Sequence, residues 1–228
     1  MQSNQKVNGI AGAIISFTES NTKNKQEKHI EQSESESTLS LDQVASSLED
    51  LLRIIRNKKS CKQVIRIPKL LQSLIALVTF RLGTHLREQT DLLRLQVRRQ
   101  SRECLYCIRL YGDEQDQSEL VNVGFGRVMI ITFCTAGGVG EEKDAEIENG
   151  LCHISDLLRQ LHEGRTWLTS FQPLPLLARV SLEQIEEEAA IEEIEAQMNN
   201  KGDYDNGFIK TEANYTKAAT LNRFINQD

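Results

Sequence analysis

The sequence predicts an all-α protein: a single helical bundle with a central apolar helix or hairpin, a disordered N-terminal segment, and an acidic C-terminal helix followed by a tail. Two observations carry this prediction. Apolar residues recur at helical spacing in several segments, and no partner strand for a β-hairpin is visible beside them. Of the 228 residues, 39% are hydrophobic, which suffices for one core with tails.

Amphipathic stripes mark the expected helices in chain order. Apolar residues between Leu41 and Ile55 follow one helical face. The stretch Leu70–Phe80 is apolar over most of its circumference, which predicts a central helix. A third pattern runs from about Leu86 to Leu110, and the most regular stripe spans Ile147–Leu161.

The apolar segment from Val123 to Ala136 predicts a buried helix. Its β-branched residues, among them Val128 and Ile130, leave a strand as the alternative. We favour the helix because the neighbouring segments are all helical in pattern. The glycines that follow, from Gly137 to Gly140, should end it.

The two ends of the chain have a different composition from the middle. Residues 1–38 are expected to be mostly disordered, because 19–38 contain almost no apolar residues; the apolar stretch 7–17 could form a short docked helix or a loose tail. Residues 39–180 form the expected helical domain. An acidic helix over 181–198 and a flexible tail over 199–228 complete the predicted organisation.

Charge is unevenly distributed along the chain. The net charge of −6 is uneven: residues 51–103 carry +10 and residues 104–228 carry −12. This asymmetry predicts internal pairing or two partner surfaces.

Five cysteines and no cleavable signal sequence suit a reducing compartment, so we expect a cytoplasmic protein, with the nucleus left open. The apolar runs fall well short of the roughly 20 residues of a membrane span, so we expect no transmembrane anchor.

The sequence contains no recognisable catalytic constellation. We therefore expect a protein that is not an enzyme and that binds no cofactor and no metal. The pair Cys104 and Cys107 lacks the second pair of ligands that a structural zinc site needs, and it lies in an apolar helical pattern. These two cysteines are interpreted as core residues.

A group of arginines is expected on the outer face of the third helix. Such a face could contact nucleic-acid phosphates or an acidic partner, or dock on the glutamate-rich stretch 183–195 of the same chain. It lacks the aromatic residues of a single-strand binder. A helical adaptor, a viral accessory protein and a nucleic-acid-associated protein all remain alternatives on this evidence. The arginines are Arg94, Arg98, Arg99 and Arg102.

The most informative feature is the pair Gly126-Arg127 at the start of the apolar segment. A charge in that position either pairs within the protein or meets an acidic partner. Over residues 121–171 the chain resembles the first and second homology motifs of the B-cell-lymphoma (Bcl) family of apoptosis regulators. The stretch Val123–Arg127 stands where the family has Asn-Trp-Gly-Arg, and a helix then leads to Trp167. The family's Asn-Trp is replaced here by Gly124 and Phe125, and divergent viral members of the family can depart from its pattern.

The resemblance implies a protein-interaction domain of anti-apoptotic type that binds the amphipathic death-motif helices of other proteins in a hydrophobic groove. In that arrangement Arg127 would pair with an acid of the bound helix, and Gly126 would allow its backbone to approach closely. Val128 and Phe133 would line the groove wall, and Trp167 would support the second motif.

Overall fold

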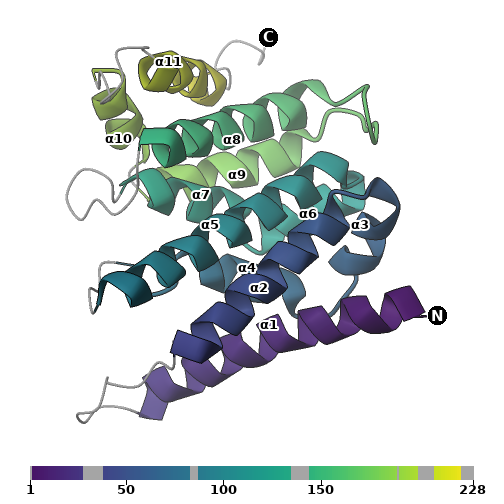
Figure 1. Ribbon diagram of the computed structural model, residues 1–228. Coiled ribbons are helices and arrows are strands. Elements are labelled where there is room, and N and C mark those ends of the chain that lie inside the picture. The colour runs from purple at the N-terminus through teal and green to yellow at the C-terminus, as the bar shows by residue number, and fades with distance from the viewer. Residues whose placement is uncertain are drawn as a thin grey trace. The chain divides into compact units, whose positions relative to one another are not determined.

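The computed structural model describes residues 2–27, 38–82, 87–134, 144–188, 190–199 and 208–221. Within these ranges the regular elements are all helices, so the all-α prediction is confirmed (Figure 1). In chain order they are α1 Gln2–Glu27, α2 Thr38–Ile55, α3 Lys58–Ile65, α4 Leu70–Val78, α5 Glu88–Tyr111, α6 Glu114–Asn122, α7 Phe125–Cys134, α8 Asp144–Glu163, α9 Pro175–Glu187, α10 Ala190–Gln197 and α11 Phe208–Leu221.

The chain divides into two compact units, Met1–Gly112 and Asp113–Asp228. The division falls between α5 and α6, where Asp113 caps α6. The Asp113 carboxylate accepts a hydrogen bond from the backbone N–H of Asp116 at 3.2 Å, and the Asp116 carboxylate accepts one from the N–H of Asp113 at 2.8 Å. The expected domain over 39–180 does not coincide with either unit.

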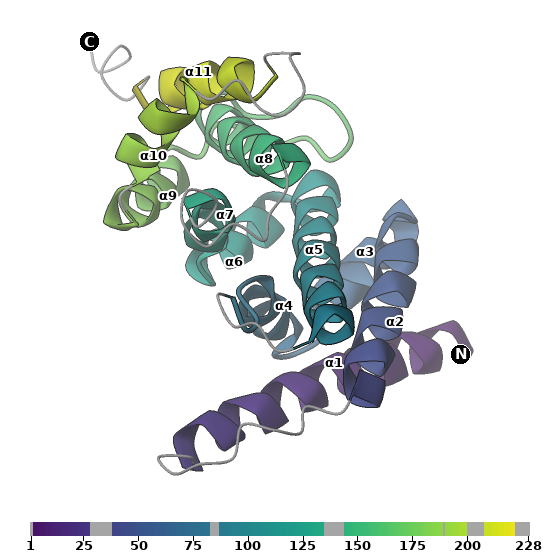
Figure 2. The ribbon, with the colours of Figure 1, turned by 60° about the vertical axis from the view of Figure 1, so that its left-hand side comes forward.

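The first unit is centred on the packing of α2 and α4 against α5. The apolar stripe of α2 is buried as predicted, from Leu41 to Ile55. In α4, which is buried on most sides, Leu70, Leu74 and Leu77 are among the fully enclosed side chains. Figure 2 shows α1 crossing beside α2 and α4, both of which it contacts.

Helix α1 corrects the prediction that residues 1–38 are mostly disordered; residues 28–37 lie outside the described ranges. Val7, Ala11 and Ile14 are buried at helical spacing. The Phe17 ring lies with its centroid 5.4 Å from that of Phe80. A polar helix with one buried stripe gains its stability from tertiary packing, which composition alone does not reveal.

The second unit is built around α8, which contacts α7, α9 and α11. The stripe Ile147–Leu161 is buried as predicted, and Phe125–Cys134 is a helix rather than a strand. The predicted acidic helix 181–198 is divided between α9 and α10. Within the expected flexible tail, α11 packs on α8, and the Thr216 hydroxyl donates a hydrogen bond to the Leu151 carbonyl at 2.9 Å. Within the described ranges, none of the helices combines the length and apolar character that crossing a bilayer requires.

Candidate functional site

The segment that begins α7 is shaped by a tight turn. Gly124 has a φ of 86°, a left-handed conformation that favours glycine, and its N–H donates to the Val121 carbonyl at 3.0 Å. The Gly124 carbonyl in turn accepts from the N–H of Val128 at 3.2 Å. This turn places Gly126 and Arg127 in the first turn of α7.

Gly126 lies next to α9, with room for a methyl group at ordinary van der Waals distance. A methyl group on Gly126 would lie 3.5 Å from the Ser181 carbonyl oxygen and 3.6 Å from a side-chain carbon of Ile185, both on α9. The close neighbour expected from the sequence is therefore present, but it is a helix of the same chain.

Arg127 is paired within the second unit. Its guanidinium forms ion pairs with Glu187 at the end of α9 and with Glu188 directly after it; the Nε–Oε1 distance to Glu188 is 3.0 Å. The side chain remains partly exposed. Of the two outcomes expected for this arginine, internal pairing is the one that the structure contains.

Helix α9 lies on α7 with an amphipathic face. Its buried residues recur at intervals of three and four and are Ala178, Ser181, Leu182 and Ile185. The Gln184 side-chain amide donates to the Val121 carbonyl at 2.8 Å, which fixes α9 against the end of α6. Glu187 and Glu188 follow this buried stripe and form the ion pairs with Arg127. Helix α9 therefore has the pattern expected of an amphipathic ligand helix.

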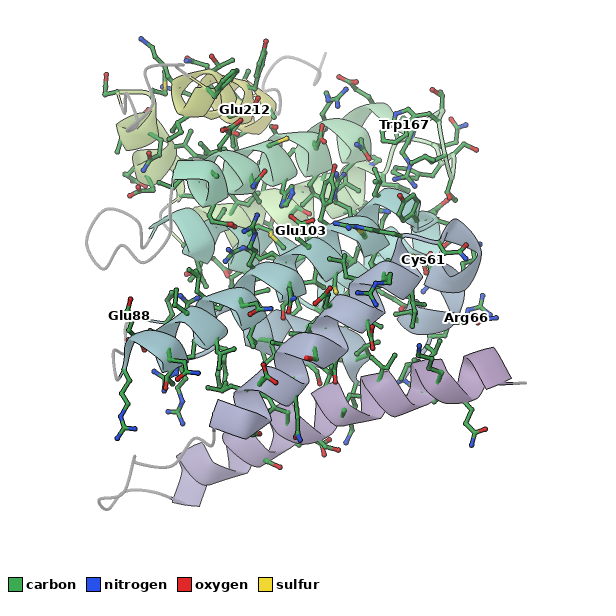
Figure 3. All side chains as sticks on the ribbon, in the orientation of Figure 1. Cys61, Arg66, Glu88, Glu103, Trp167 and Glu212 are labelled. Carbon is green, nitrogen blue, oxygen red and sulfur yellow. The ribbon has the colours of Figure 1, made fainter. Side chains whose placement is uncertain are left out.

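The other residues of the expected groove are not gathered into one open surface. Val128 is buried, as are Phe125 and Met129 of the same helix, and its place in a groove wall stays a prediction. Phe133 belongs to α7, but its side chain lies outside the described part of the structure. Trp167 is half-exposed in the loop between α8 and α9 (Figure 3), where its ring contacts the Arg165 guanidinium.

The predicted basic face on α5 is wrong for three of its four arginines. Arg94, Arg98 and Arg102 are buried, and Arg99 is exposed. Arg98 donates to the Phe80 carbonyl, at 3.4 Å, and Arg94 lies 3.5 Å from the Asp91 carboxylate. Long aliphatic stems let arginines pack within a helical protein while their guanidinium groups reach internal acceptors. This burial removes the exposed row of cations that phosphate binding would need.

Cys104 and Cys107 are buried in α5, as expected for core residues. Burial is the main cause that raises the pKa of both thiols, and the nearby Glu103 contributes. Both are therefore protonated at neutral pH and poorly nucleophilic. Among the described residues there is no cluster of side chains suited to hold a metal ion.

Comparison of the chain with protein-family models, with curated proteins and with solved structures finds no match. The candidate site is the contact between α7 and α9. The sequence indicated its α7 half through Gly126 and Arg127. The acids on the α9 side, Glu187 and Glu188, lie about sixty residues from Arg127 in the chain. Apart from the amphipathic spacing of α9, no sequence pattern near them predicted that they would pair with Arg127.

Proposed function

We propose that this protein is a non-enzymatic, Bcl-like regulator that binds amphipathic helices of other proteins on the α7 surface bearing Gly126 and Arg127. The observation that supports this proposal most directly is the packing of α9 on that surface. A helix with an apolar stripe approaches Gly126, and its terminal acids pair with Arg127. This is the chemistry by which an amphipathic ligand helix is recognised.

In this proposal α9 occupies the site in the described structure, and a partner helix competes with it. The proposal therefore calls for a partner with small or apolar residues at intervals of three and four, followed by an acid. That acid would replace Glu187 and Glu188 as the ion-pair partner of Arg127. A role in restraining cell death follows from the resemblance over residues 121–171.

Competition with α9 predicts opposite effects for the two sides of the ion pair. In the variant Glu187→Gln/Glu188→Gln, α9 loses its charged contact, so a labelled amphipathic death-motif peptide carrying an aspartate should bind more tightly. Within that double glutamine variant, where α9 has no charged contact left to lose, the further change Arg127→Ala should weaken the same binding by about fivefold, which corresponds to the roughly 1 kcal/mol that a partly exposed ion pair contributes at most. Fluorescence anisotropy with the full chain measures both.

Arg179→Ala is the matched control, because Arg179 is also a partly exposed arginine of the second unit and pairs with Glu183 at 3.0 Å on α9. It should leave the affinity unchanged. Failure of the peptide to bind both the wild-type chain and the double glutamine variant would contradict the proposal. So would equal affinities of the Arg127 and Arg179 variants when each is made in the double glutamine background.

A further inference from the structure

The buried stripe of α9 contains one polar residue. Ser181 belongs to the same stripe as Ala178, Leu182 and Ile185, and it is fully buried. Within the described part of the structure its hydroxyl oxygen has no hydrogen-bond partner. Its backbone carbonyl oxygen would lie 3.5 Å from a Cβ built on Gly126. Ser181 is therefore in the part of α9 that packs next to Gly126.

Gln184, on the next turn of α9, makes a second incomplete contact. Its side-chain N–H donates to the Val121 carbonyl at 2.8 Å, but its amide oxygen is buried and accepts no hydrogen bond from the described residues. That oxygen would lie 3.5 Å from a Cβ on Gly126. Two polar side-chain atoms in this part of α9 are thus removed from water without being paired.

Buried polar atoms without partners weaken the attachment of α9 to its own unit. Taking a hydroxyl or an amide oxygen out of water costs free energy unless a new hydrogen bond replaces those that water supplied. This cost is present while α9 is packed and disappears when α9 leaves. The buried side chains of Leu182 and Ile185 and the ion pairs of Arg127 act in the opposite direction. Helix α9 is therefore attached less strongly than a helix of the same spacing without unpaired polar atoms would be.

We infer, on the basis of the proposed function, that α9 is a self-inhibitory ligand of the α7 surface, and that the partner which displaces it is a helix of the same spacing with alanine or glycine at the position of Ser181. The pattern of this partner follows from α9, with Glu187 as the reference acid. Small residues stand nine and six positions before the acid, where α9 has Ala178 and Ser181. Larger apolar residues stand five and two positions before it, where α9 has Leu182 and Ile185.

A small apolar residue at the position of Ser181 explains how a partner can compete with a helix of the same chain. Because α9 is tethered to its site, its effective concentration there is high, and it occupies the site despite its unpaired hydroxyl. A partner that binds from solution needs a higher intrinsic affinity. Alanine fits wherever serine fits, since it lacks only the hydroxyl oxygen, and it loses no hydrogen bond with water on burial.

Ser181→Ala in the full chain tests the inference from the side of α9. The variant should hold α9 more firmly, so the second unit should unfold at a higher urea concentration, as followed by the emission of Trp167, the only tryptophan. In the Glu187→Gln/Glu188→Gln background, Ser181→Ala should also weaken the binding of a labelled peptide with the sequence of residues 174–188. The expected loss of affinity is about fivefold, measured by fluorescence anisotropy.

Ser101→Ala in the same background is the matched control. Ser101 on α5 is also fully buried, and its hydroxyl oxygen also has no partner among the described residues. The substitution brings the same gain in helix propensity and removes the same kind of unpaired atom. Because Ser101 belongs to the first unit, its substitution should change the affinity for the 174–188 peptide by less than about twofold.

The peptide tests the inference from the side of the partner. The 174–188 peptide with Ser181→Ala should bind the double glutamine chain about tenfold more tightly than the wild-type peptide, since it gains in helix propensity and loses the unpaired hydroxyl. Val180→Ala in the peptide is the control, because Val180 is 38% exposed and lies outside the buried stripe. That change raises helix propensity alone and should improve the affinity by no more than about threefold.

Three results would overturn the inference. The first is equal affinity of the wild-type and Ser181→Ala peptides, which would leave the proposed function intact. The second is a Ser181→Ala chain whose second unit unfolds at a lower urea concentration, which would mean that the hydroxyl stabilises the packing of α9. The third is the absence of binding by either peptide to the double glutamine chain. That result would also contradict the proposed function, because α9 has the pattern that the α7 surface is proposed to bind.

Discussion

Glu212 is a carboxylate whose surroundings disfavour its charge. It lies on α11, which packs against α8 (Figure 3). Partial burial raises its pKa above the ordinary value of 4.5, and the nearby Glu148 and Asp156 add to the rise. The folded state therefore binds this proton more tightly than the unfolded state. Its contribution to stability is present below about pH 4.5 and is lost as the pH rises through the folded pKa.

Glu212→Gln should consequently stabilise the protein at pH 7 and have no such effect below about pH 4.5. The gain should be less than about 0.5 kcal/mol, because the side chain is partly exposed and solvent screens its interactions. Urea unfolding at pH 4 and pH 7 measures the difference. Glu183→Gln is a control of opposite sign, since it removes an acid that pairs with Arg179. A loss of stability in the Glu212 variant at pH 7 would contradict the prediction.

The arginines show how far single residues can be predicted from sequence. The position of Arg127 in the sequence predicts that it pairs with an acidic residue, and in the structure it forms ion pairs with two glutamates. Its partners could not be named, because Glu187 and Glu188 are distant in the chain and only the packing of α9 on α7 brings them there. Arg98 was expected to face solvent because charged residues usually do. It is fully buried, with the Phe80 carbonyl as one of its acceptors.

Among the elements, α1 contributes a buried stripe to the first unit. Ile14 is fully enclosed there, so Ile14→Ala should reduce the free energy of unfolding by about 2–4 kcal/mol. The neighbouring Ile15 is only half-buried, and Ile15→Ala should cost clearly less. Chemical denaturation followed by circular dichroism compares the two variants. Equal losses would mean that α1 is not docked through the Val7–Ile14 stripe.

Elements with a strong apolar period were predictable, and elements held by a few contacts were not. The stripes of α2 and α8 and the helical state of α7 follow from the sequence. Helix α11 and the end of α1 lie in segments whose composition resembles that of disordered chains, whereas the apolar stretch 7–17 of α1 allowed a short docked helix as one of two alternatives. What orders them is contact with other helices, such as the hydrogen bond from Thr216 to Leu151. A sequence pattern does not contain that information.

At the scale of the whole molecule, the chain carries opposite charges in its two units. Residues 1–112 contain 18 Lys and Arg against 11 Asp and Glu, a net charge of +7, whereas residues 113–228 carry −13. Each unit also has its own buried core, around α5 in the first and α8 in the second. The sequence showed the charge asymmetry but not the boundary, because Gly112 and Asp113 form only a short break between two helices.

Separate cores predict that each unit folds independently. Fragments 1–112 and 113–228, expressed singly, should both be helical by circular dichroism and unfold cooperatively in urea. A fragment that ends at Gln100, within α5, is the control and should fail to unfold cooperatively, because it lacks the end of the central helix. Loss of helical structure in both correct fragments would show that the two units depend on each other.

The placement of tryptophan and cysteine makes the two units of this chain separately observable. The single tryptophan, Trp167, lies in the second unit, and three buried thiols lie in the first, those of Cys61, Cys104 and Cys107. The second unit contains two further cysteines, Cys134 and Cys152, so in a variant with Cys134→Ser and Cys152→Ser thiol reagents report only on the opening of the first unit, whereas indole emission responds to events in the second. The two measurements on one sample therefore give the order in which the two units unfold.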